Sequence, residues 1–236
     1  MTETRITASD LAALLAARAP PGATLLVGVT GSVAVGKSTL VAALKEELPP
    51  KTETVSTDGY LLPNAILKER DLLLRKGFPE SYDADALIAT LTAARAGPVT
   101  VPGYSHVIYD VDPALARTIG RQEILIFEGL GFAPLPDGRR VGDGLDTLIY
   151  IDADEADLEA WYVARFLGFW RAAADDPASF YAQFRTMSEP EADAFARRVW
   201  AGINLPNLRE HIVRARDTAD IVVRKGPDHG LTLVRG

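Results

Sequence analysis

Residues 31–38 read Gly-Ser-Val-Ala-Val-Gly-Lys-Ser and fit the phosphate-loop pattern G-x-x-x-x-G-K-[S/T] without a mismatch. The stretch before them, 24–30, is short, apolar and β-branched and predicts a buried strand. The stretch 38–48 predicts a helix that two prolines end. A turn between a strand and a helix would need neither Lys37 nor Ser38. The sequence therefore predicts a phosphate-binding loop.

In such a loop, glycines let backbone N–H groups curl around phosphate oxygens, and the helix N-terminus adds its dipole. Lys37 is expected to neutralise the β and γ phosphates of ATP, and Ser38 to ligate Mg²⁺. The residues expected to hold the nucleotide here are Gly31, Ser32, Val33, Ala34, Val35, Gly36, Lys37, Ser38 and Thr39.

Similar apolar runs alternate with helical patterns along the rest of the chain. Strands are predicted at 52–57, 124–127, 147–151, 219–223 and 231–234, and helices at 10–19, 83–96, 154–169 and after the capping box that starts at Ser188. This alternation favours an α/β fold with a mostly parallel central sheet flanked by helices. We expect an N-terminal helix and lead-in at 1–22 and a single domain at 23–236.

Composition excludes several classes of protein. The 236 residues carry a net charge of −7, which disfavours a nucleic-acid binder. There is no cysteine, so disulfides, Cys-zinc sites and thiol nucleophiles are excluded. No apolar stretch is long enough to span a membrane, and the N-terminus is a poor signal peptide. We expect a cytoplasmic enzyme that binds neither nucleic acid nor membrane.

Acidic residues follow two of the predicted strands. Asp58 follows the run 52–57, and Glu128 follows the run 124–127. Ligands of parallel sheets bind beyond the carboxyl ends of the strands, so both carboxylates are expected beside the phosphate loop. There they could hold Mg²⁺ or take a proton from a substrate hydroxyl. Asp152 immediately precedes a predicted helix and is expected to be its N-cap.

Distinctive strings elsewhere in the chain carry a resemblance to a known family. They are TDGYLLPN at 57–64, KGFPESYD at 76–83, YSHVIYD at 104–110, WYVARFL at 161–167 and INLPNL at 203–208. Together with the phosphate loop, these strings resemble bacterial type I pantothenate kinases, from about residue 24 to the C-terminus. That family belongs to the wider group of P-loop kinases that contains uridine kinase and phosphoribulokinase.

The resemblance implies ATP-dependent phosphorylation of the primary hydroxyl of pantothenate, the first step of coenzyme A biosynthesis, by a homodimer. It also implies a P-loop kinase fold with an acceptor-binding insertion at about 59–120 and a helical lid at about 154–216. Asp58 matches the family's proposed base at the acceptor hydroxyl, Arg165 a cation near the transferred phosphate, and His229 a histidine beside adenine. The remaining matches to the pantothenate pocket are Tyr104, His106, Tyr162 and Asn204.

One predicted helix face supports part of this assignment. Tyr162, Arg165, Phe166 and Phe169 are spaced i, i+3, i+4 and i+7, which places them on one side of a helix. We expect Phe166 and Phe169 to pack in the core, and Tyr162 and Arg165, as polar groups on an apolar stripe, to belong to the site. His106 and Asn204 could equally be structural on residue type alone.

Two departures from the family pattern bear on regulation and substrate. Ala42 stands where an arginine is expected in members that coenzyme A inhibits, and Gly131 where an asparagine is usual. Because Ala42 offers no charge to the inhibitor, we expect weak inhibition by coenzyme A. The N-terminal region that helps to frame the adenine site in typical members is reduced to about twenty residues here, which leaves the base preference open.

Two alternatives stay open. The acceptor could be another hydroxylated metabolite, such as a nucleoside or a sugar phosphate. A second phosphate would require further cations near Asp58, and the right stretch contains Lys68, Arg70, Arg75 and Lys76. The other alternative is a nucleotide-binding regulator that hydrolyses ATP slowly and needs no acceptor pocket.

Overall fold

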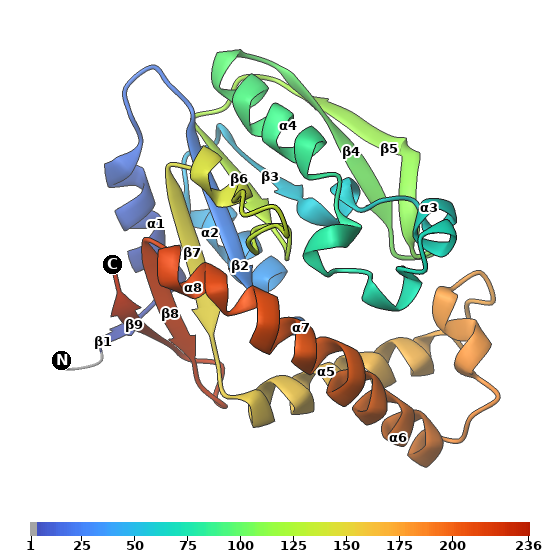
Figure 1. Ribbon diagram of the computed structural model, residues 1–236. Helices are drawn as coiled ribbons and strands as arrows, with labels where there is room; N and C mark the ends of the chain where they lie inside the picture. The colour runs from blue at the N-terminus through green and yellow to red at the C-terminus, as the bar shows by residue number, and fades with distance from the viewer. Residues whose placement is uncertain (1–3) are drawn as a thin grey trace.

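The computed structural model describes residues 4–236 and contains a seven-stranded sheet with helices on both faces (Figure 1). The strand order is β1-β9-β8-β7-β2-β6-β3, and β3, β6, β2, β7 and β8 run parallel. β9 and β1 add an antiparallel edge. The predicted α/β class with a mostly parallel sheet is confirmed. The strands are β1 Thr4–Ile6, β2 Leu25–Gly31, β3 Thr52–Ser56, β6 Ile124–Glu128, β7 Thr147–Asp152, β8 Ile221–Lys225 and β9 Leu231–Arg235.

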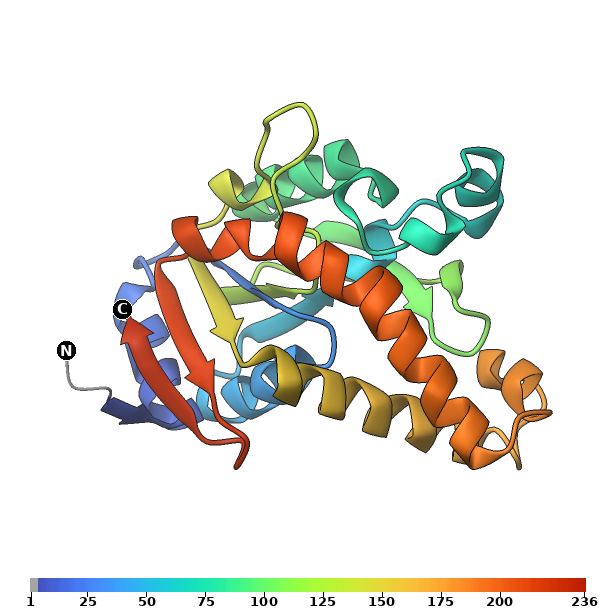
Figure 2. The ribbon, with the colours of Figure 1, turned by 60° about the horizontal axis from the view of Figure 1, so that its bottom comes forward.

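Helices cover the sheet and extend beyond it. α1 packs on α2, which packs on β2, β3 and β6, whereas α8 packs on β7 and β2. α5 and the almost continuous helical run 189–218 form a pair that projects away from the sheet (Figure 2). Two turns of that run, 200–204 and 208–212, are π-helical. The helices are α1 Ala8–Arg18, α2 Lys37–Glu47, α3 Asn64–Glu69, α4 Ala84–Ala96, α5 Glu155–Ala172, α6 Glu189–Val199, α7 Leu205–Asn207 and α8 Arg214–Thr218.

A separate hairpin lies beside the edge of the sheet that ends in β3. Its strands are β4 Val99–Ser105 and β5 Asp110–Ile119, and β4 contacts both β3 and the 3-10 turn at 57–60. The strand periodicity did not predict these strands. The pairing shifts register between Val101 and Gly103, and a Cβ at Gly103 would collide with Leu115. The bulge interrupts the alternation by which a strand is recognised.

The core has two parts. The main cluster fills the space around the sheet with fully buried residues such as Leu26, Phe127 and Ile149. A second cluster lies between α5 and α6 and contains Phe166 and Trp170. This second cluster packs α5 and α6 against each other.

Three sequence expectations are corrected. α1 begins at Ala8 rather than at residue 10, and its cap is Thr7, whose hydroxyl accepts from the backbone N–H of Asp10 in a capping box; Ser9 and Asp10, which could have capped a helix starting at 10, lie inside it. Asp152 ends β7 and accepts from Arg216 Nε at 3.0 Å, so it is not a helix cap. Phe169 is 38% exposed rather than core. The capping box at Ser188 is confirmed.

Candidate active site

The phosphate loop connects β2 to α2 and is held open by unusual backbone angles. Gly31 and Gly36 have φ values of 142° and 96°, and Ala34 has a φ of 63°. These are angles that glycine adopts at little cost. A Cβ on Gly31 would collide with the carbonyl oxygen of Ile151. The loop therefore depends on glycine both for its dihedral angles and for its close approach to β7.

Lys37 is the first residue of α2 and lies across the loop. Its Nζ donates to the carbonyl oxygens of Ser32, at 2.9 Å, and Gly31, at 3.2 Å. Burial lowers the pKa of Lys37, while the carboxylates of Glu128 and Asp58 oppose that shift. The ammonium is thus held over the loop, where bound phosphate oxygens can replace the two carbonyls as partners.

Ser38 and Glu128 form an oxygen pair beside the loop. Ser38 Oγ donates to Glu128 Oε1 at 3.1 Å. Burial raises the pKa of Glu128, and Lys37 opposes the shift. Hydroxyl and carboxylate oxygens suit Mg²⁺, which needs only one or two protein ligands besides water and phosphate. Residues 4–236 contain no cluster of three or more His, Asp or Glu that could hold a metal alone.

Asp58 follows β3 in a 3-10 turn, Thr57–Tyr60, whose first N–H groups are capped by Ser56. Asp58 is half-buried, and its charge contributes to the pKa of both Lys37 and Tyr104. β3 pairs with β6, and β6 with β2. This order explains why Asp58, Glu128 and Lys37 meet at one end of the sheet, as their positions after predicted strands indicated.

The hairpin supplies an aromatic wall next to Asp58. The Tyr104 ring packs edge-on against His106, with centroids 5.1 Å apart, and against Tyr109, 6.0 Å apart. Burial raises the pKa of Tyr104 and of Tyr109, so both phenols stay protonated. Tyr109 also stacks on Phe180 at 4.3 Å, which joins the hairpin to the segment between α5 and α6. His106 is exposed at the hairpin turn.

The projecting helices bring the remaining predicted residues together. Tyr162 on α5 lies beside Asn204, which is in the first π-helical turn. Burial raises the pKa of Tyr162 to about 12, and hydrogen bonding to Asn204 opposes the shift. Arg165 is exposed, stacks on the Phe169 ring at 5.4 Å, and acts electrostatically on Lys37 and Glu128. The i, i+3 spacing places Tyr162 and Arg165 one turn apart on α5, and their membership of the site stays a prediction.

His229 lies elsewhere, in the turn between β8 and β9. It has a φ of 62° and packs on the Trp161 ring, with centroids 5.1 Å apart. Lys225 Nζ lies 4.4 Å from the centre of the same ring and donates to the carbonyl of Val35 in the phosphate loop at 2.9 Å. Neither Trp161 nor Lys225 was predicted as a site residue. Trp161 immediately precedes Tyr162, but no spacing relates Lys225 to the loop.

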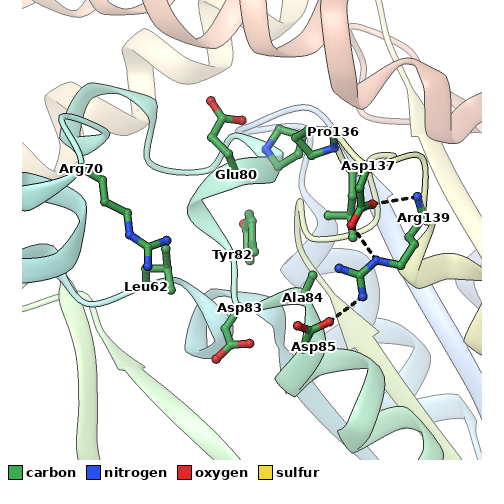
Figure 3. A pocket seen from close by; sticks show the side chains of 12 residues that line it. Leu62, Arg70, Glu80, Tyr82, Asp83, Ala84, Asp85, Pro136, Asp137 and Arg139 are labelled. Atoms are coloured by element: carbon green, nitrogen blue, oxygen red, sulfur yellow. Dashed lines mark hydrogen bonds and ion pairs between the residues drawn. The ribbon is translucent and has the colours of Figure 1, made fainter.

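A cavity of about 490 Å³ lies away from these residues (Figure 3). It is bordered by the 79–85 segment and by the loop 135–139. Its charged groups are partly neutralised, because Arg139 pairs with Asp137 at 2.7 Å and with Asp85 at 2.5 Å. None of the predicted site residues lines this cavity. The candidate site is therefore the region at the carboxyl ends of β2, β3 and β6, between the phosphate loop, the hairpin and the projecting helices.

Comparison with curated proteins gives close relatives. The chain is 46% identical over 218 residues to a pantothenate kinase of Rhizobium rhizogenes, covering 86% of this chain and 66% of that protein. It is 45% identical over 219 residues to a pantothenate kinase of Sorangium cellulosum, covering 89% of this chain and 71% of that protein. No protein-family model matches the chain.

Solved structures support the fold. A candidate fructose transport system kinase from Silicibacter sp. TM1040 is 26% identical, with a TM-score of 0.70 over 91% of this chain and 95% of that one. A D-glycerate 3-kinase from Cryptococcus neoformans has a TM-score of 0.65 over 95% of this chain and 97% of that one, and at 16% identity it shows the fold alone. With its phosphate loop, its kinase fold and its close relatives, the chain belongs to the pantothenate kinase family.

Proposed function

We propose that this protein transfers the γ-phosphoryl group of ATP to the primary hydroxyl of pantothenate. The observation that carries the proposal is the place of Asp58, in the 3-10 turn that follows β3. That turn contacts β4 of the hairpin and lies at the end of the sheet where the strand order β3-β6-β2 also brings Glu128 and the phosphate loop. The names of the relatives supply the acceptor.

Each residue would have a separate task in the transfer. Asp58 accepts the hydroxyl proton as the acceptor oxygen bonds to the γ-phosphorus and the bond to the bridging oxygen of ADP breaks. Lys37 and Arg165 neutralise charge on the moving phosphoryl group. Ser38 and Glu128 would hold Mg²⁺, which supplies further charge neutralisation at the phosphates when bound.

The acceptor pocket suits a neutral amide and a single carboxylate. Tyr162 and Asn204 would donate hydrogen bonds from a hydroxyl and an amide to the carboxylate of pantothenate, while Asp58 would accept the proton of its primary hydroxyl. An acceptor with a second phosphate would require free cations near Asp58. Arg75, one of the candidates, is instead paired with Glu80 and lies over the Phe78 ring at 4.0 Å. This pairing removes Arg75 as a free cation, whereas Lys76 still interacts electrostatically with Asp58, so the choice of pantothenate over a sugar phosphate rests on the names of the relatives.

A coupled ADP-release screen over pantothenate, uridine, cytidine and sugar phosphates tests the proposal. We expect acceptor-dependent ADP release with pantothenate and close to none with the others. The Lys37→Ala variant serves as the matched blank for contaminating kinases. Release with uridine or a sugar phosphate but not with pantothenate would overturn the acceptor assignment. Release that no acceptor stimulates would favour the slow nucleotide-hydrolysing regulator.

A further inference from the structure

Lys76 lies in the acceptor region and has no role in the transfer described above. Its Nζ donates to Asn64 Oδ1 at 2.7 Å and to the backbone carbonyl of Tyr109 at 2.5 Å. The same ammonium lies 4.9 Å from the centre of the Tyr104 ring and 4.7 Å from that of Tyr109. A half-buried cation with two oxygen partners and two aromatic partners is firmly localised.

The carbonyl that Lys76 holds belongs to a strained residue. Tyr109 has a φ of 55°, which is uncommon for a large side chain and persists only when its surroundings enforce it. Its carbonyl oxygen accepts from Lys76 Nζ and also from Asn64 Nδ2 at 3.0 Å. The backbone N–H of Asn64 donates in turn to Asp110 Oδ1 at 3.0 Å. These bonds fix the hairpin turn to the start of α3.

The position of this turn matters to both sides of the acceptor site. Tyr109 packs against Tyr104 in the aromatic wall and stacks on Phe180 in the segment between α5 and α6. The backbone N–H of Phe180 also donates to the carbonyl of Val107 in the turn at 2.9 Å. A change at the Tyr109 carbonyl would therefore move the aromatic wall and its contact with the projecting helices together.

We propose that Lys76 is a positioning residue for the acceptor, which acts through Tyr109 and Tyr104 and does so only as the ammonium ion. Loss of the proton removes the cation–π attraction and weakens both donated hydrogen bonds, because a neutral amine no longer gives them charge assistance. The inference rests on the proposed phosphorylation of pantothenate, since it concerns how that site holds its acceptor.

The charge of Lys76 is within reach of ordinary pH. Burial lowers the pKa of Lys76 to about 8, and the carboxylates of Asp110 and Asp58 oppose the shift. The other titratable groups packed against Lys76 are the phenols of Tyr104 and Tyr109. Burial raises the pKa of both phenols. Since the folded-state pKa of Lys76 is depressed, the ammonium is present below about pH 8 and is lost as the pH rises through that value.

The test compares the wild type with Lys76→Arg and Lys76→Met in steady-state assays with pantothenate, with ATP saturating, from about pH 7 to about pH 9. For the wild type we expect kcat/KM for pantothenate to fall roughly 5- to 10-fold over this range. Arginine stays charged throughout, so the Lys76→Arg profile should be flat. Lys76→Met should raise KM for pantothenate roughly 10-fold at about pH 7, with little change in KM for ATP.

The control is Lys45→Met, which removes an exposed lysine in the last turn of α2 that is paired with Glu53 on β3. It should keep the wild-type pH profile. If wild type and Lys76→Arg fall equally with pH, or if the wild-type profile is flat, the inference is wrong, even where Lys76→Met is unstable. A wild type that does not turn over pantothenate at any pH would instead contradict the proposed function, and the same comparison would then use the acceptor that the ADP-release screen identifies.

Discussion

The phosphate loop and the acceptor pocket are neighbours that are built in different ways. The loop consists of consecutive residues, and its shape comes from backbone angles at Gly31, Ala34 and Gly36. The acceptor pocket consists of side chains from distant segments that only the fold brings together: Asp58, Tyr104, His106, Tyr162 and Asn204. A backbone cradle suits a phosphate chain that many proteins bind, whereas a set of side chains can be fitted to one acceptor. Substitutions in the two regions should therefore affect different constants.

The largest expected effect belongs to Asp58, which lies between the phosphate loop and the acceptor pocket. Asp58→Asn keeps the shape of the side chain but removes the proton acceptor, so kcat should fall roughly 10²- to 10⁴-fold. ATP affinity, measured by equilibrium binding, should hardly change. Loss of ATP binding with normal turnover per bound ATP would place Asp58 on the nucleotide side instead, as a metal or structural residue.

Lys37→Ala tests the loop alone. No other side chain of the loop is a cation, so phosphoryl transfer should slow by roughly 10²-fold or more, about 3 kcal/mol of transition-state stabilisation. Single-turnover kinetics with saturating pantothenate would measure it. A near wild-type rate would contradict the assignment of the phosphate loop.

The variants Tyr162→Phe and Asn204→Ala test the acceptor pocket alone. Losing one hydrogen bond to a charged group costs about 1.5–3 kcal/mol, which corresponds to an increase of roughly 10- to 150-fold in KM for pantothenate. KM for ATP should stay close to the wild-type value. Equal increases in both constants would mean that the two regions are not separable and that the pair supports the fold rather than the acceptor.

The smallest expected effect concerns coenzyme A. Ala42 is exposed on α2, one turn beyond Ser38, and offers no charge to the inhibitor's phosphates. We expect coenzyme A to compete only weakly with ATP, and Ala42→Arg to strengthen the competition several-fold through one added charge contact. Inhibition of the wild type at micromolar coenzyme A or below would contradict this expectation.

The same contrast explains how far the sequence could be interpreted. Every strand of the sheet except β1 follows from apolar runs, as α2, α4 and α5 follow from helix stops, because residues near in sequence decide these elements. The hairpin was missed because residues 113–116 of β5 lie opposite Pro102 alone, and this register shift breaks the alternation. The N-cap assignment of Asp152 was wrong because Arg216, distant in sequence, pairs with it at the end of β7.

Site residues divide in the same manner. Four site residues could be chosen because they follow predicted strands: Lys37, Ser38, Asp58 and Glu128. The carboxyl ends of parallel strands lie at the same end of the sheet. Tyr162 could be chosen as a polar group on an apolar helix face, but Asn204 needed the family resemblance, because no spacing relates it to the other site residues. Lys225 could not be found at all, since its contact with Val35 exists only once β8 lies beside the loop. Phe169 was misplaced because the cluster between α5 and α6 is too small to bury it.

The contact of Trp161 with Lys225 and His229 gives the protein an optical reporter. Indole emission responds to charges and to solvent near its ring. The other two tryptophans are buried, Trp170 within the α5–α6 cluster and Trp200 in the main core. Trp161 should therefore dominate any change in fluorescence when a nucleotide reaches the loop. With Trp170 and Trp200 replaced by phenylalanine, nucleotide arrival could be followed in real time without a label and separately from turnover.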